Sequence, residues 1–143
     1  MKKQILVIIL LAIFVVSCLA LTACGTVNAS KGLEYKLSAD GTHYIVSGIG
    51  TCTDTAVIIP ERFLGKPVAS IGDGAFWNCA SMTSITIPNG VTYIGSYAFS
   101  SCTGLTSINI PSGVTTIGSW AFYDCYSLTS ATIGNSVITI GER

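Results

Sequence analysis

The chain has 143 residues, a length that suits a single domain. Its 7 basic residues balance 7 acidic residues, so the sequence lacks the basic excess typical of nucleic-acid-binding proteins, and we expect no nucleic-acid partner. It contains one histidine, His43, and no Gly-x-Ser-x-Gly segment, which argues against hydrolases and other enzymes. We expect no catalytic residues and no cofactor.

The first 23 residues have the three parts of an export signal. Lys2 and Lys3 precede a run, residues 5–20, that is almost wholly apolar, and Leu21-Thr22-Ala23-Cys24 follows. These last four residues resemble the lipobox of bacterial lipoproteins, which implies cleavage before Cys24 and acylation of its thiol. Val15-Val16-Ser17-Cys18 is a poorer second lipobox candidate, because cleavage there would fall inside the apolar run. A plain signal peptide, or an uncleaved anchor over residues 5–23, is the alternative.

This start predicts an exported protein, lipid-anchored to the outer face of the bacterial cytoplasmic membrane or the cell surface. Cleavage would leave five basic residues against seven acidic ones, a net charge of −2. Residues 24–31 are then a polar tether. The stretch from Thr83 to Gly141 contains one charged residue, Asp124. We therefore expect no strong electrostatic steering of a partner.

Residues 32–55 predict an N-terminal β-hairpin. Two short β-prone runs, Leu33–Leu37 and Tyr44–Val46, flank an Asp-Gly turn signal at residues 40–41. We interpret this hairpin as a cap that covers the core of the first repeat. Shortly after it, the charged insertion Glu61–Lys66 is expected to form an exposed loop.

Residues 56–143 contain about three and a half repeats. A 23-residue unit occurs twice without a gap, at residues 83–105 and 106–128, with a degenerate copy before it and a partial copy after it. A fixed period of this length indicates a solenoid whose coils bury their apolar faces against one another.

Each repeat predicts a series of short elements. Ile85 and Ile87 alternate with Ser84 and Thr86, as in a half-buried strand, and a Pro-x-Gly turn follows. A second extended piece comes next, and then Gly-Ser-x-Ala-Phe, which predicts one helical turn. The expected N-caps of these turns are Asp73, Ser96 and Ser119. The expected internal ladder is formed by Phe76, Phe99 and Phe122.

The pattern Leu-x-x-Ile-x-Ile-Pro-x-x-Val-x-x-Ile-Gly-x-x-Ala-Phe-x-x-Cys resembles the BspA-like (treponemal-type) leucine-rich repeat, from about Val57 to Gly141. The resemblance implies a right-handed leucine-rich-repeat solenoid with a concave parallel sheet. It also implies surface-exposed bacterial proteins that act as adhesins or interaction modules. The expected fold is mainly β, with one short helical turn per coil, a hairpin cap and no C-terminal cap.

Cys79, Cys102 and Cys125 are spaced 23 residues apart and occupy one column of the repeat. Neighbouring coils lie about 4.8 Å apart, a separation that permits a disulfide, but three thiols that point the same way cannot all pair. We expect buried free thiols, while a disulfide involving Cys52 stays open. No metal site is expected, because His43 lies apart from the cysteines.

Equivalent positions of successive repeats that are expected to face solvent predict a non-catalytic binding or adhesion surface for an extracellular protein or glycan. The strand-face candidates are Ser84, Thr86, Ser107, Asn109, Ser130 and Thr132. The aromatic candidates are Trp77, Tyr97, Trp120 and Tyr123. A merely soluble sheet face and partly buried rings are the plainer interpretation of the same residues.

The last repeat lacks the Ala-Phe segment, although Val137 and Ile140 occupy core columns. This end suggests an open coil that could support self-association. The alternative function is therefore a truncated structural remnant of a longer repeat protein, with no ligand of its own.

Overall fold

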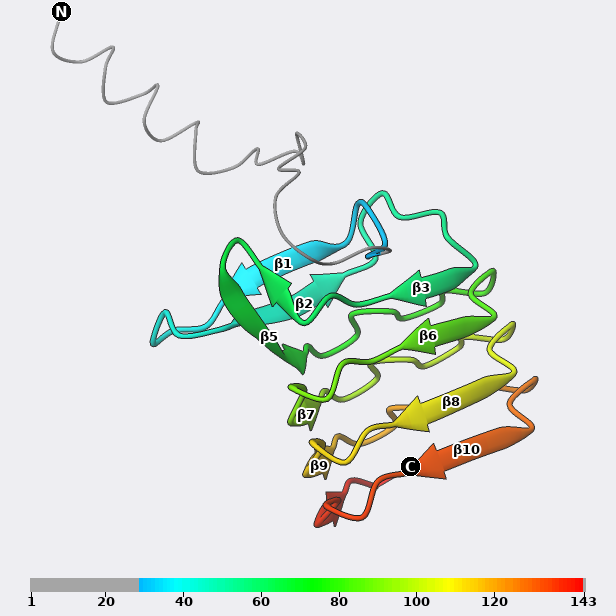
Figure 1. The fold of residues 1–143 in the computed structure, drawn as a ribbon. Coiled ribbons are helices and arrows are strands. Elements are labelled where there is room, and N and C mark those ends of the chain that lie inside the picture. The colour runs from blue at the N-terminus through cyan, green and yellow to red at the C-terminus, as the bar shows by residue number, and fades with distance from the viewer. Residues whose placement is uncertain (1–28, 143) are drawn as a thin grey trace, which may run out of the picture.

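The computed structural model describes residues 29–142, so the predicted export signal and Cys24 lie outside the described residues. Over this span the chain forms eleven strands and no helix, wound into stacked coils (Figure 1). None of the described residues belongs to a helix long and apolar enough to cross a membrane. The predicted β-rich solenoid is confirmed.

The N-terminal hairpin is present. β1 (Glu34–Leu37) and β2 (Tyr44–Gly48) pair antiparallel, with Tyr35 opposite Val46. In the turn, the Asp40 carboxylate accepts hydrogen bonds from the Ser38 hydroxyl and from the Thr42 backbone N–H, which lower the pKa of Asp40 to about 2. β2 then pairs parallel with β5, which places the hairpin at one end of the solenoid. Its role as a cap stays a prediction.

Two sets of strands run along the coils, and strands from neighbouring coils pair in parallel. The continuous sheet contains β1, β2, β5 (Lys66–Ile71), β7 (Tyr93–Ile94), β9 (Thr116–Ile117) and β11 (Thr139–Ile140). The second set consists of two pairs, β3 (Ala56–Ile58) with β6 (Ser84–Thr86) and β8 (Ser107–Ile110) with β10 (Ser130–Ile133). Tyr93 pairs with Thr116, and Ser107 with Ser130. Each repeat period in this part of the chain is therefore one coil.

The insertion after the first repeat strand is a second hairpin rather than the predicted loop. β4 (Arg62–Phe63) pairs antiparallel with β5, and the turn residues Leu64 and Gly65 have positive φ. Phe63 stacks on Tyr35 with ring centroids 4.0 Å apart, and it meets Tyr44 edge-on at 5.0 Å. These aromatic contacts pack the insertion against the first hairpin. The charged residues of the insertion had suggested an exposed loop without such contacts.

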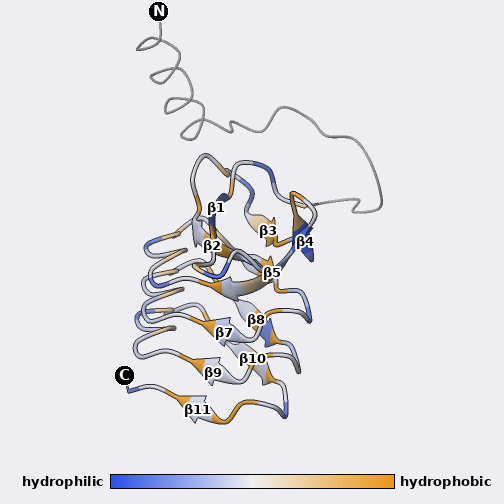
Figure 2. Cartoon of the chain, turned by 90° about the vertical axis from the view of Figure 1, so that its left-hand side faces the viewer, coloured by the Kyte–Doolittle hydropathy of each residue, from blue (hydrophilic) through white to orange (hydrophobic). Residues whose placement is uncertain are grey.

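The predicted helical turns are β-turns, stacked along one edge of the coils (Figure 2). The backbone N–H of Phe76 donates to Ala98 O, and that of Phe99 donates to Ala121 O, both at 2.8 Å. Because these N–H groups bond to the next coil, they are unavailable for the bonds of a helix. The predicted N-cap of the first turn is also wrong, since Asp73 Oδ1 accepts from the Ser96 N–H of the next coil at 2.8 Å.

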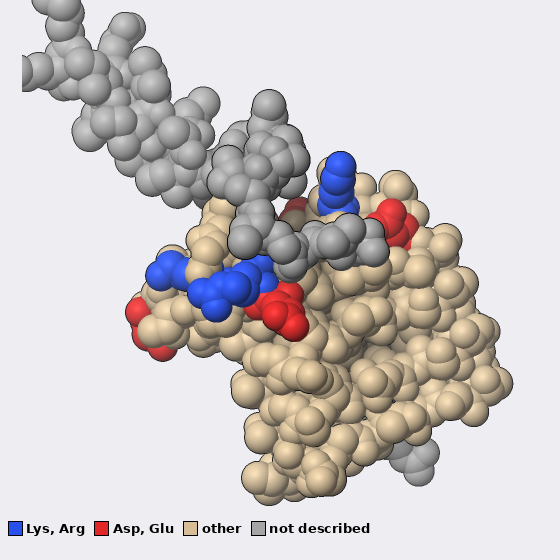
Figure 3. Space-filling view, in the orientation of Figure 1, with Lys and Arg blue, Asp and Glu red and all other residues tan. Residues whose placement is uncertain are grey.

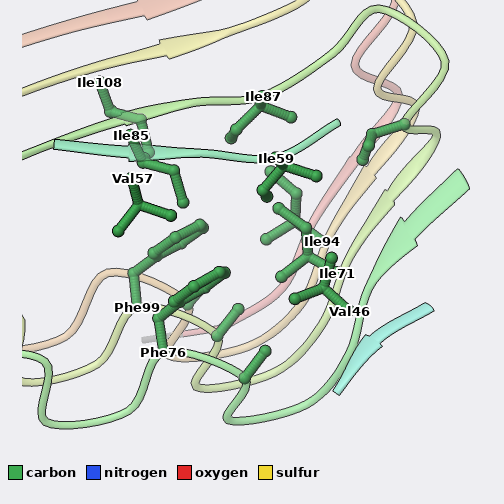
Figure 4. Packing of buried hydrophobic residues seen from close by; sticks show 14 of the residues in the cluster. Val46, Val57, Ile59, Ile71, Phe76, Ile85, Ile87, Ile94, Phe99 and Ile108 are labelled. Atoms are coloured by element: carbon green, nitrogen blue, oxygen red, sulfur yellow. The ribbon is translucent and has the colours of Figure 1, made fainter. Parts of the chain in front are cut away.

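The core contains the predicted phenylalanine row. The rings of Phe76, Phe99 and Phe122 stack with successive centroids 5.3 Å apart and almost parallel planes. Phe76 and Phe99 are completely buried, and Figure 4 shows them beneath the isoleucines of the strands. Ile85 and Ile108 face inward, as predicted. The row therefore lies inside the molecule at Phe76 and Phe99, while Phe122 in the following coil is partly buried against it.

A glycine column lets the coils approach closely. A Cβ atom at Gly95 would lie 2.5 Å from both the Asp73 nitrogen and the Gly72 carbonyl carbon of the preceding coil. Distances this short are not tolerated between non-bonded backbone atoms. The Ile-Gly segment of the repeat is thus required by the spacing between coils.

The last described coil is covered on one side. Ile133 and Ile140 are 52% and 63% exposed, whereas their partners in the preceding coil, Ile110 and Ile117, are buried. Self-association through this face stays a prediction.

Candidate ligand-binding surface

The strand-face candidates lie in register on neighbouring coils. Ser107 lies beside Ser130, and Asn109 lies beside Thr132. These four side chains and that of Thr86 are exposed, while Ser84 is half-buried. β6 and β8 share no strand pairing but lie side by side, with the Thr106 N–H donating to Thr83 O at 3.1 Å, so the face continues from coil to coil. The structure places these residues together in pairs, and their role in binding stays a prediction.

The repeated coils present a surface almost without charge. On the face shown in Figure 3, the basic and acidic side chains gather around the N-terminal coils, and the lower coils are free of them. From Thr83 to Gly141 the charged residue is Asp124. The Tyr126 hydroxyl donates to Asp124 Oδ1 at 2.8 Å, and this hydrogen bond and the negative charge of the carboxylate raise the pKa of Tyr126.

Three of the four aromatic candidates come together at the turns. Tyr97 and Trp120 stack with centroids 6.3 Å apart and planes 4° from parallel, and Tyr123 meets Trp120 edge-on at 5.1 Å. The exposed fractions of Tyr97, Trp120 and Tyr123 are 48%, 36% and 47%. We call these three residues the aromatic ledge. The residue between Trp77 and Tyr123 in their common column is the buried Ser100, so Trp77 is not part of the ledge.

The two stacked rings of the ledge are carried by an unusual backbone conformation. Tyr97 and Trp120 have φ values of 56° and 59°, in the left-handed region that bulky side chains rarely occupy. Gly74 holds the same position one coil earlier with a φ of 63° and no such penalty. Backbone strain of this kind costs about 1–3 kcal/mol for each residue and is concentrated at functional sites.

Sequence reasoning missed Tyr126, which is highly exposed and lies on the same turn as Tyr123. A signal was present in the sequence. The second copy of the repeat reads Ser-Ser-Cys-Thr at residues 100–103, whereas the third reads Tyr-Asp-Cys-Tyr at residues 123–126. Much of the difference between two otherwise similar copies is therefore gathered on this turn.

Trp77 belongs to a separate hollow at the N-terminal end of the turns. This hollow, of about 420 Å³, is lined by Ile49, Cys52, Trp77, Cys79 and Met82 among others. Cys52 and Cys79 both line this hollow, and each makes a turn hydrogen bond, from the Cys52 N–H to Ile49 O and from the Cys79 N–H to Phe76 O.

The four described cysteines all carry free thiols. Cys102 is buried and donates its thiol to Phe76 O at 3.0 Å, and Cys125 donates to Phe99 O at 3.1 Å. The neighbouring Cys79 thiol and burial raise the pKa of Cys102 well above its ordinary value. Full burial was expected for the whole predicted column but holds for Cys102 alone, since Cys79 and Cys125 are partly buried.

Comparison with known proteins supports the repeat assignment. The family model described as "BspA type Leucine rich repeat region (6 copies)" matches residues 67–143. No match was found among the curated proteins.

Two solved structures are similar in fold and sequence. A leucine-rich repeat protein from T. pallidum is 32% identical with a TM-score of 0.74, over 77% of this chain and 51% of that one. A leucine-rich repeat protein from Bacteroides ovatus is 33% identical with a TM-score of 0.70, over 81% of this chain and 31% of that one. The present chain therefore corresponds to about half of the first protein and a third of the second.

Proposed function

This chain belongs to the BspA-type leucine-rich repeat family, and from that premise we propose that it is a non-catalytic binding module held outside the cell by a lipid anchor. The fold is one whose members generally act as protein-interaction modules. Surface display, adhesion and the lipid anchor go beyond the family assignment and form our proposal.

The observation that carries this proposal is the exposed, nearly uncharged surface repeated from coil to coil. Ser107 and Asn109 are aligned with Ser130 and Thr132, and the buried phenylalanine row holds the coils in place beneath them. A surface with this order can present the same hydrogen-bonding groups at regular intervals, as an extended ligand requires. The ligand we expect is an extracellular protein or a glycan.

The size of this surface limits its affinity. Four strands at about 4.8 Å, each showing roughly five residues of about 3.3 Å, give a face near 300 Å² in plan. A stable protein interface needs about 800 Å² from each partner. We therefore propose that a single copy binds weakly and that many copies on one membrane attach through avidity.

The predicted lipid anchor would supply that membrane density. Each buried acyl methylene contributes about 0.8 kcal/mol, and two or more chains are needed for stable attachment. Replacing Cys24 with serine in the full-length protein should abolish incorporation of labelled palmitate and release the protein from membranes. Cys18→Ser is the matched control and should leave both unchanged. Unaltered incorporation in Cys24→Ser would contradict the anchor.

The binding proposal is tested with bacterial cells that display the full-length protein. We expect retention on an array of extracellular-matrix proteins and glycans, reduced in the double variant Asn109→Ala, Thr132→Ala. Asn89→Ala, at an exposed turn, removes a comparable polar group away from the strand face. Absence of retention on every array member would contradict the binding function and favour a structural remnant.

A further inference from the structure

We propose that the aromatic ledge formed by Tyr97, Trp120 and Tyr123 is a binding site for a neutral oligosaccharide, with Asp124 and Tyr126 as its polar partners. This inference rests on the proposed binding function and names the ligand class for one surface. The strand face described above is a separate surface and can be tested separately.

Positive φ recurs in these turns, at Asn78, Ser101 and Asp124 as well, but at Tyr97 and Trp120 it is combined with a large aromatic side chain. The turn folds with Gly74 in the left-handed position of the first repeat, so the fold itself does not need an aromatic side chain there. Tyr97 and Trp120 occupy that position in the next two coils and keep 48% and 36% of their surface exposed. An unfavourable conformation that presents large apolar rings to solvent is expected where the rings are used for binding.

The geometry of the rings suits flat ligands. The Tyr97 and Trp120 planes are 4° from parallel, and Tyr123 closes one side of Trp120 at an interplanar angle of 76°. The apolar faces of sugar rings can pack against such aromatic faces, because each presents a flat array of C–H groups to the negative face of the ring.

The area of the ledge decides between a sugar and a protein. Aromatic side chains bury about 150–250 Å² each, so three rings that are a third to a half exposed offer roughly 250 Å². This is about a third of the 800 Å² that a stable protein partner covers. A ligand of one or two ring-sized units can use the ledge fully, whereas a globular partner cannot.

The charge around the ledge selects a neutral ligand. Between Thr83 and Glu142 the chain carries two carboxylates, Asp124 and Glu142, and no basic residue, and the Glu142 backbone oxygen accepts from the Trp120 N–H at 2.7 Å. An anionic ligand would be repelled by these carboxylates, and the residues described from Thr83 to Glu142 include no cation that would offset the repulsion. The hydroxyl groups of a neutral sugar can instead donate to the Asp124 carboxylate, which already accepts from the Tyr126 hydroxyl at 2.8 Å.

The test uses the full-length protein in detergent micelles and two probes, the β-1,4-linked tetrasaccharides of glucose and of N-acetylglucosamine. Tryptophan fluorescence is recorded in a Trp77→Phe background, so that the signal comes from Trp120. We expect a saturable change with at least one probe, a dissociation constant of about 1 mM or below, and little dependence on salt.

Variants then locate the binding by calorimetry. Trp120→Ala should weaken binding about tenfold, while Trp120→Phe, which keeps a ring, should weaken it less. Trp77→Ala removes the same side chain outside the ledge and should leave affinity unchanged. Failure of both probes to bind, or equal losses in Trp120→Ala and Trp77→Ala, would overturn the inference.

The two proposals fail separately. If neither tetrasaccharide binds but displayed cells still adhere to the array through the strand face, the ledge inference falls and the binding function stands. If Trp120→Ala lowers stability without changing tetrasaccharide affinity, the ledge is structural and the inference also falls.

Discussion

The repeat builds two aromatic rows from one turn, and they differ in what they contribute. The inner row of Phe76, Phe99 and Phe122 stacks at 5.3 Å within the core. The outer pair of Tyr97 and Trp120 stacks at 6.3 Å with much of its surface in solvent. The inner rings occupy a position where aromatic side chains from three successive repeats pack against one another. The outer rings occupy a position where glycine would suit the backbone better.

This difference separates folding from recognition within a single 23-residue unit. Residues that face the core must match between coils, because each shelters the next. Residues on the outside of the turn are free of that requirement, and there the second and third copies differ most. Substitutions in the two rows should therefore have different consequences.

The largest loss of stability is expected from the inner row. Phe99→Ala removes a fully buried ring between two others and should lower the free energy of unfolding by about 3–5 kcal/mol. Urea denaturation followed by circular dichroism measures this value. Trp120→Ala in the outer row is the comparison and should cost less than half as much. Equal losses would remove the distinction between the rows.

The spacing of both rows depends on the glycine column. Gly95→Ala places a methyl group 2.5 Å from the preceding coil and should cost about 1–3 kcal/mol of stability. Gly90→Ala is a matched control, since its Cβ would lie 3.7 Å from the Val68 carbonyl oxygen, an ordinary contact. Thermal unfolding of both variants measures the difference. Similar stabilities would show that the coils can separate at Gly95 without cost.

A smaller effect should reveal the strain in the outer row. Trp120 has a φ of 59°, and Trp120→Gly should be more stable than Trp120→Ala by about 1 kcal/mol. The reason is that alanine, unlike glycine, is strained in the left-handed conformation. At Thr116, in the strand β9, Thr116→Ala should instead be more stable than Thr116→Gly by about 0.5–1 kcal/mol. Urea denaturation of the four variants tests both signs. A more stable alanine variant at Trp120 would mean that the backbone there is unstrained.

The last prediction uses thiol labelling of the native protein to distinguish buried cysteines from accessible ones. Cys102 is buried and its thiol pKa is raised by Cys79 and by burial, so native-state alkylation should reach Cys52 and Cys79 first. Mass spectrometry after timed alkylation measures the order. In denaturant without reductant, Cys52, Cys79, Cys102 and Cys125 should all react. Two unlabelled cysteines among them would instead indicate a disulfide.

Much of the fold could be predicted from the period. The recurrence of Ile85 at Ile108 and of Phe76 at Phe99 was sufficient to place the strands, the core and the internal row. The hairpin followed from its Asp-Gly turn. The candidate surface could be predicted only as columns of exposed residues, because a period states which residues are equivalent and not how far apart they lie.

The repeat period alone established a solenoid, because apolar residues at equal intervals can be buried only by stacking equal coils. The helical turns were predicted wrongly, since alternate backbone N–H groups of a turn, such as those of Gly74, Phe76 and Asn78, bond to the next coil, a partner that local sequence does not show. The grouping of Tyr97, Trp120 and Tyr123 apart from Trp77 likewise required the tertiary structure. Side-chain neighbours on an outer turn are set by the geometry between coils, which the order of residues along one coil does not contain.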